Sequence, residues 1–175
     1  MKKYFLFVVA IVAIVVMASG CTSQTGNNTT ATKNYSANGI SFNYPSSWAI
    51  LNETSNENGT VVALGDADIQ KNNTVKGNGV TIIKVPENAN STADLSSLKT
   101  QFAGLNGTNS TETIAGVTAN ATTITTKVNN ATAQIKFIYF VKNNFIYLIQ
   151  YATLSSDFQT QQQLFNTITK SFQTS

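Results

Sequence analysis

The side chains that most often carry catalysis and metal binding are nearly absent from this sequence. The 175 residues include no His, no Arg and a single Cys, Cys21. Imidazole is the usual proton-transfer group near neutral pH and a common metal ligand, so its absence excludes Ser–His and Cys–His nucleophile pairs and His-based metal sites. We therefore predict a protein that is not an enzyme, with no catalytic residues, no metal site and no cofactor.

Two short patterns match fragments of functional motifs. Ser96 stands three residues before Lys99, which is the S-x-x-K spacing, but the companion S-D-N and K-T-G motifs are missing. Asp66 and Asp68 supply oxygen donors at alternate positions, but a calcium loop needs Gly at its sixth position, where Lys71 stands. We interpret the first pattern as part of a helix surface and the second as a solvated loop.

The chain begins with a segment typical of an export signal. Lys2 and Lys3 are followed by about fourteen nearly continuous apolar residues, a helix of about 21 Å, which is short for a hydrocarbon core of about 30 Å. Three small residues at 18–20 then precede Cys21. This order resembles the lipobox of exported lipoproteins, in which the leader is cut before a cysteine that carries a diacylglyceryl group. We predict lipid attachment at Cys21; a chance cysteine at an ordinary cleavage site, or an uncleaved anchor, is the alternative.

The predicted domains follow from this leader. Residues 1–20 form the signal peptide, and residues 21–34 form a lipid-anchored flexible linker, because 22–34 have Ala as their only apolar residue type and show no periodicity. Residues 35–175 are then a single folded domain. We expect this domain on the extracellular face of the cell membrane, held there by the membrane lipid anchor.

The net charge excludes nucleic acid as a partner. The formal charge of +3 includes Lys2 and Lys3, so the chain without its leader is close to neutral. It therefore has no lysine-rich stripe to neutralise phosphates, and the absence of Arg removes the preferred bidentate ligand of phosphate and guanine.

Asparagine, threonine and serine are abundant and form many N-glycosylation acceptor sequences. The chain has 21 Asn and 40 Ser or Thr residues, which would give about five Asn-x-Ser/Thr sequons by chance. Eleven are present, a twofold excess that favours glycosylation; clustering of Asn and Thr in loops is the alternative. The candidate asparagines are Asn27, Asn28, Asn34, Asn52, Asn58, Asn72, Asn90, Asn106, Asn109, Asn120 and Asn130.

Short runs rich in β-formers predict eight strands. The last three form an antiparallel meander with turns at 129–130 and 143–144, because Asn tolerates positive φ. Apolar residues on both faces of 135–141 indicate a central strand covered on both sides. The predicted strands are 39–44, 48–52, 60–64, 80–85, 111–114, 120–128, 132–141 and 145–153.

Two amphipathic helices are predicted to supply that cover. Ser91 and Asp94 have the spacing of a capping box before an apolar stripe that ends at residue 105. Ser156 and Gln159 have the same spacing before a second stripe that includes Phe165. The fold class is therefore α+β, with an antiparallel β-sheet and helices packed on both faces.

Several of these segments carry a family resemblance. Tyr35, the run GISFNYP at 39–45, Trp48, AGVTA at 115–119 and FNTITKSF at 165–172 occur in an order that resembles the PsbP-like family. This family is named for an extrinsic subunit of photosystem II, and the segments also resemble PsbP-related lipoproteins of methanogenic archaea. The resemblance implies a PsbP-like αβα sandwich. No motif is present onto which the ion-linked role of the photosynthetic subunit could be carried.

Two functional hypotheses remain. The first is a non-enzymatic lipid-anchored cell-surface domain that binds or supports another envelope or membrane-complex component. The alternative is a small-ligand or glycan-binding lipoprotein that delivers solute to a membrane partner. Tyr139, Tyr147 and Tyr151 would stack on sugars if exposed, although packing on the sheet is their more common role. A concave aromatic-lined pocket would favour the alternative, and a flat apolar patch would favour the first hypothesis.

Overall fold

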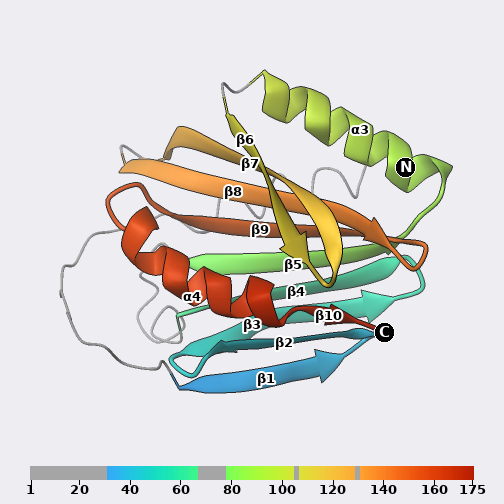
Figure 1. Ribbon diagram of the computed structural model, residues 1–175, viewed down its shortest axis with the longest axis horizontal. Coiled ribbons are helices and arrows are strands. Elements are labelled where there is room, and N and C mark those ends of the chain that lie inside the picture. Colours follow the sequence, from blue (N-terminus) through green and yellow to red (C-terminus); the bar gives the residue numbers. More distant parts are fainter. Residues whose placement is uncertain (1–30, 67–77, 105–106, 129–130) are drawn as a thin grey trace.

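The computed structural model describes residues 31–66, 78–104, 107–128 and 131–175. In these residues, two antiparallel sheets and two helices form the fold (Figure 1). The larger sheet has seven strands in the order β3-β4-β5-β9-β8-β7-β6, and the smaller has three in the order β1-β2-β10. The elements are β1 (Thr32–Ala37), β2 (Ile40–Pro45), β3 (Trp48–Asn56), β4 (Gly59–Asp66), β5 (Gly79–Pro86), α3 (Ala89–Ala103), β6 (Thr108–Ile114), β7 (Val117–Val128), β8 (Ala131–Lys142), β9 (Phe145–Leu154), α4 (Phe158–Ser171) and β10 (Gln173–Thr174).

The meander predicted for the last long strands is confirmed. β8 pairs with β7 on one side and with β9 on the other, so that Ile138 lies opposite both Ala121 and Ile149. The turn between β8 and β9 places Asn143 and Asn144 at φ values of 53° and 61°, which Asn adopts more readily than most residues. The predicted turn at 129–130 lies outside the described residues.

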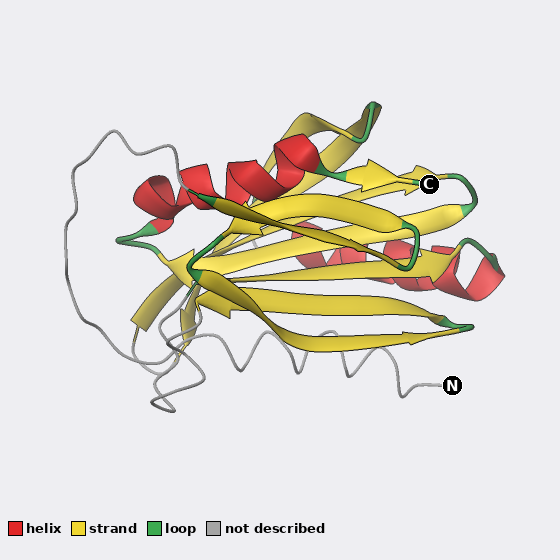
Figure 2. Cartoon of the chain, turned by 90° about the horizontal axis from the view of Figure 1, so that it is seen from below, coloured by secondary structure: helices red, strands yellow, loops and turns green. Residues whose placement is uncertain are grey.

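One face of the larger sheet carries the main core. Alternate residues of β8 and β9 point from this face toward α4 and the smaller sheet. α4 lies across the face (Figures 1 and 2), and its Phe165, which is 0% exposed, stacks on Tyr151 with ring centroids 4.7 Å apart. Trp48 is also buried in this cluster. The combination of aromatic rings from two sheets and one helix makes this side the denser part of the core.

The opposite face carries a smaller apolar cluster beneath α3. Phe102 of α3 stacks on Phe137 of β8 with ring centroids 4.0 Å apart, and Leu98 packs beside them. Leu95 and Phe102 are the buried residues of this 15-residue helix. The predicted α+β class with a mainly antiparallel sheet is thus confirmed. The helical cover is sparser than an αβα sandwich with helices packed on both faces implies, since each face carries one helix in the described residues, and a second sheet forms part of the layer on the α4 side.

Both helix starts differ from the prediction. α3 begins after Asn88, whose Oδ1 accepts hydrogen bonds from the amides of Asn90 and Ser91 at 3.0 and 3.1 Å, while Ser91 Oγ accepts one from the Asn88 amide. The capping box is therefore formed by Asn88 and Ser91. Asn88 is the N-cap residue, and Ser91, which was predicted as the cap, is the third residue of the helix. α4 begins after Asp157, which makes no side-chain cap bond.

Two strands were absent from the sequence prediction. β1 begins at Thr32, inside the segment predicted as a linker, and Tyr35 is its one buried residue. β10 is a pair of residues after α4. Both strands are defined by their pairing with β2, a long-range contact that leaves little periodic signal in such short segments. Within the part of the chain that is described, no helix has the length and apolar character of a membrane span.

Candidate functional site

A hollow beneath α3 is the best candidate for a binding site. It has a volume of about 290 Å³ and lies between the C-terminal half of α3 and the strands β6, β7 and β8. This is close to the lower end of the range for ligand pockets. We call it the α3 pocket, and its lining residues are Lys99, Phe102, Ala103, Asn109, Ser110, Asn120, Ala121, Thr122 and Tyr139.

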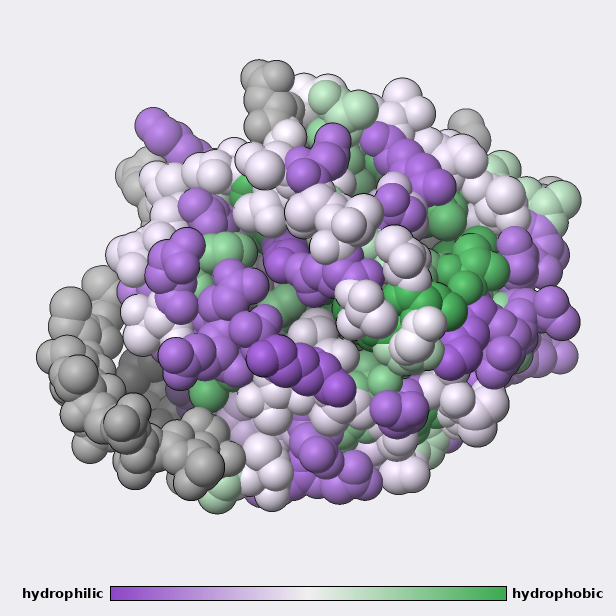
Figure 3. Space-filling view, in the orientation of Figure 1, coloured by the Kyte–Doolittle hydropathy of each residue, from purple (hydrophilic) through white to green (hydrophobic). Residues whose placement is uncertain are grey.

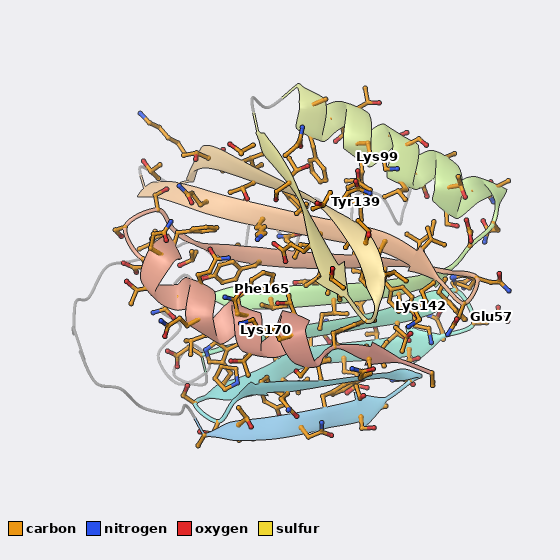
Figure 4. All side chains as sticks on the ribbon, viewed as in Figure 1. Glu57, Lys99, Tyr139, Lys142, Phe165 and Lys170 are labelled. Atoms are coloured by element: carbon orange, nitrogen blue, oxygen red, sulfur yellow. The ribbon has the colours of Figure 1, made fainter. Side chains whose placement is uncertain are left out.

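One side of the α3 pocket is lined by the rings of Phe102 and Tyr139 and by the ammonium group of Lys99. The half-buried ring of Tyr139 lies beneath the ammonium group of Lys99, with 4.7 Å between Nζ and the ring centroid. Figure 4 shows the two side chains next to each other below α3. Burial raises the pKa of the Tyr139 hydroxyl, so the phenol is neutral at physiological pH and can donate a hydrogen bond. This side can therefore contact an apolar ligand face and an acidic group.

Amides and hydroxyls form the other side of the pocket. Asn109 of β6 and Thr122 of β7 are direct partners in the sheet, and Thr122 Oγ1 donates to Asn109 Oδ1 at 2.8 Å. The Nδ2 group of Asn109 keeps its donors, and Asn120 is exposed with no side-chain hydrogen bond within the described residues. Such groups bind hydroxyl-rich ligands, since each amide both donates and accepts.

A second hollow of about 280 Å³ lies at the turn between β1 and β2. Its lining comes from residues 36–41 and 173–175, which contribute Ile40 and otherwise small or polar side chains, with no aromatic ring and no charged side chain. Because ligand recognition usually combines apolar contact with a few directed polar groups, this hollow is the weaker candidate.

Three lysines of the sheet point toward the α4 side, and the sequence analysis did not identify them. Lys84 is 9% exposed, and its Nζ donates to the Asn38 carbonyl at 2.9 Å and lies 4.2 Å from the centre of the Phe145 ring. Lys136 forms an ion pair with Glu112, and Lys142 donates to a carbonyl group of the β6–β7 turn. The alternation of strand residues places all three on one face, which was the available signal. Their bonds indicate a structural role.

Most of the sequence-predicted site residues do not gather in one place. Cys21, Asn27, Asn28, Asn72, Asn106 and Asn130 lie outside the described residues, as does Asp68. Asn34, Asn52, Asn58 and Asn90 are exposed and spread over three strands or turns and α3. The fold brings together Asn109 and Asn120 at the α3 pocket. In the described ranges, no group of three acidic or thiol side chains could hold a metal ion.

The three tyrosines considered for ligand stacking have different positions. Tyr147 and Tyr151 are 0% exposed and belong to the core on the α4 side. Tyr139 is half-buried and lines the α3 pocket. Lys99, which the S-x-x-K spacing singled out, also lines this pocket, whereas Ser96 Oγ donates to the Thr92 carbonyl within the helix.

Comparison with known families identifies the family of the chain. The sequence model of the PsbP-like protein family matches residues 6–174, and the chain belongs to this family. The resemblance seen in the sequence is thereby confirmed. A search of curated proteins finds no match.

Solved structures share the fold at low sequence identity. The solution structure of cyanobacterial PsbP from Synechocystis matches with a TM-score of 0.55 and 14% identity, over 88% of this chain and 98% of that one. A crystal structure from Bacteroides thetaiotaomicron matches with a TM-score of 0.52 and 14% identity, over 78% of this chain and 45% of that one. LpqN, involved in cell envelope biogenesis of Mycobacterium tuberculosis, matches with a TM-score of 0.49 and 14% identity, over 84% and 92% of the two chains.

Proposed function

We propose that this PsbP-like protein is a non-enzymatic, lipid-anchored binding domain at the outer face of the cell membrane, and that the α3 pocket holds a sugar unit of an envelope component. The observation that carries the proposal is the composition of the pocket. One half-buried tyrosine ring, one lysine, two exposed asparagines and two hydroxyl residues meet in a hollow of about 290 Å³. The export signal and Cys21 support the location.

The pocket chemistry favours a sugar over other small ligands. Sugars present a C–H face that packs on aromatic rings and several hydroxyls that pair with amides and hydroxyls. Lys99 adds one positive charge, so a sugar with a carboxylate is expected to bind more tightly than its neutral counterpart. The same site serves the hypothesis that the domain supports an envelope component, since the bound sugar would belong to that component.

The described surface gives less support to a protein partner. Val141 is the large hydrophobic residue that is exposed in the described part of the chain, at 44%. Hydrophilic and intermediate residues dominate the α4 side of the molecule, and the apolar residues there cover a limited area (Figure 3). A flat apolar patch, which would favour docking of a protein, is not formed by the described residues on this side.

The test is calorimetric titration of the full chain, purified in detergent, with uronic acids and the matching neutral sugars. Tyr139→Ala is expected to weaken binding of both classes about tenfold, equivalent to about 1.4 kcal/mol of lost contact. Lys99→Gln is expected to weaken only the acidic sugars. Lys127→Gln, at another exposed lysine, serves as the matched control. Absence of sugar binding, or binding that is unaffected by Tyr139→Ala, would contradict the proposal.

A further inference from the structure

The asparagines outside sequons mostly have structural roles. Asn38, Asn143 and Asn144 adopt positive φ in turns, and Asn88 caps α3. Others accept side-chain hydrogen bonds that join neighbouring segments. Asn43 accepts from Asn34, Asn56 from the Asn58 amide, and Asn78 from Thr153.

The asparagines inside sequons are different. All six that the structure describes are exposed, but exposure does not separate the two sets, because Asn38, Asn56, Asn88, Asn143 and Asn144 are exposed as well. The difference lies in the side-chain hydrogen bonds. Asn34 Nδ2 donates to Asn43 Oδ1 at 3.0 Å, and Asn109 Oδ1 accepts from Thr122 at 2.8 Å. The other four make no side-chain hydrogen bond within the described residues. If Asn and Thr merely clustered in loops, asparagines inside and outside sequons would be expected to form side-chain hydrogen bonds equally often. The four are Asn52, Asn58, Asn90 and Asn120.

The exposure of the Ser or Thr two positions later distinguishes these four sequons, because a sequon is defined by both the Asn amide and that hydroxyl. Thr60, which follows Asn58, is 5% exposed and its Oγ1 lies 3.0 Å from Ser55 Oγ. Thr122, which follows Asn120, is 7% exposed. Both sequons are therefore half closed in the folded domain. By contrast, Thr54 and Thr92 are exposed, and they complete the sequons of Asn52 and Asn90.

The two remaining sequons lie in an edge strand and at a helix end. β3 is an edge strand of the larger sheet, and its pairing with β4 shifts register between Ile50 and Asn52. Asn90 lies in the first turn of α3, two residues after the cap residue Asn88, whose Oδ1 accepts a hydrogen bond from the Asn90 backbone amide. Bulged edge strands and helix termini open at lower cost than central strands. A glycosyl-transferring enzyme could thus bind both segments in the folded protein.

We propose that, of the six sequons that the structure describes, those of Asn52 and Asn90 are the N-glycan acceptors. The donor is an oligosaccharide joined through its first carbon to a lipid phosphate. The Asn amide loses one N–H proton to a base, its Nδ2 forms a bond to that carbon, and the carbon–oxygen bond to the phosphate breaks so that the lipid phosphate leaves with the electron pair. Neither residue lines the α3 pocket, so this inference is independent of the proposed function.

The experiment is mass spectrometry of the protein purified from the membranes of its source organism, with fragmentation that assigns each sugar to one asparagine. Sugar is expected on the peptides of Asn52 and Asn90, with at least fivefold lower occupancy at Asn34, Asn58, Asn109 and Asn120. Expression of Thr54→Ala in that organism should remove the sugar at Asn52, whereas Thr54→Ser should retain it. The pair Thr92→Ala and Thr92→Ser tests Asn90 in the same way.

Three outcomes would overturn the inference. They are unmodified Asn52 and Asn90, equal occupancy at all six described sequons, and a sugar at Asn52 that persists in the Thr54→Ala variant. Because none of these measurements uses a ligand, failure here leaves the sugar-binding proposal standing, and failure of sugar binding leaves this one standing.

Discussion

The two faces of the larger sheet use the same strands but differ in what packs on them. On the α4 side, Tyr151, Phe165 and Phe140 join rings from the smaller sheet in one continuous cluster. On the α3 side, a helix with two buried residues covers a cluster centred on Phe137 and leaves the α3 pocket beside it. Because β8 alternates its side chains between the faces, a single strand contributes to both. A dense face stabilises the fold, and this allows the other face to keep an open, polar hollow.

The charged groups show the same contrast. On the α4 side, Lys84 and Lys136 are buried, and each has a fixed partner. On the α3 side, Lys99 is exposed and lies over the ring of Tyr139. A lysine with a fixed internal partner is not available to a ligand, whereas an exposed one is. The difference between the faces is therefore one of availability as well as packing density.

The largest expected loss of stability comes from substitutions of buried rings, and it should differ between α4 and α3. Phe165→Ala should lower the free energy of unfolding by about 3–5 kcal/mol, because it removes a fully buried ring. Phe102→Ala should cost at least about 1 kcal/mol less, since α3 is packed more loosely and can settle onto the sheet. Urea unfolding of both variants measures the difference. Equal destabilisation would show that the two faces contribute alike.

The partly buried ion pair on the α4 side gives the next largest effect. Glu112→Gln leaves Lys136 without its carboxylate and should cost about 1–2 kcal/mol, less than a fully buried pair, because the Glu112 side chain is 26% exposed. Replacement of both residues, Glu112→Gln with Lys136→Met, should recover most of that loss. If the double variant is no more stable than Glu112→Gln, the pair is not coupled in this way.

The sequence predicted those parts of the molecule that local patterns determine. The strands at 120–128, 132–141 and 145–153 and the turn at 143–144 follow from β-formers and paired asparagines, and the structure confirms them. β1 and β10 could not be predicted in this way, because their strand character comes from pairing with β2. The local patterns predicted separate strands and helices, and the resemblance to the PsbP-like family predicted how they are arranged.

The site was harder to predict than the fold. Tyr139, Lys99, Asn109 and Asn120 were each noted in the sequence, but for three unrelated reasons: ligand stacking, the S-x-x-K spacing and, for both asparagines, the sequons. They meet because β6, β7 and β8 are neighbours and the C-terminal half of α3 packs beside them, and no spacing along the chain encodes that meeting. The burial that distinguishes Tyr139 from Tyr147 and Tyr151 likewise depends on which helix lies over each strand face.

A smaller effect is expected at the start of α3. Asn88→Ala removes the side chain that accepts two backbone amides and should cost about 1 kcal/mol. Asn90→Ala, in the same turn but without a side-chain bond, is the matched control and should change stability by less than about 0.5 kcal/mol. Thermal unfolding of the two variants tests this. Because α3 forms one wall of the pocket, Asn88→Ala should also weaken sugar binding, and unchanged binding would show that the cap does not position that wall.

The smallest effect at neutral pH is expected at a tyrosine, and it becomes measurable only at alkaline pH. Burial raises the pKa of Tyr151, and the charge of Asp157 raises it further. The Tyr151 hydroxyl has no hydrogen bond of ordinary geometry, so Tyr151→Phe should change stability by less than about 0.5 kcal/mol at pH 7.

The pH dependence of the free energy of unfolding above pH 10 is expected to differ between Tyr151 on the α4 side and Tyr139 on the α3 side. Above pH 10 the unfolded chain loses the Tyr151 proton while the folded chain keeps it, so stability is fully present below pH 10 and falls as the pH rises toward the folded-state pKa. Tyr151→Phe should remove up to about 1.4 kcal/mol of that loss per pH unit. Tyr139→Phe should remove less, because Tyr139 is only half-buried. Urea midpoints between pH 8 and pH 11 measure both slopes. Equal slopes for the two variants would mean that the α3 side excludes water as fully as the α4 side, and the contrast between the faces would then rest on packing alone.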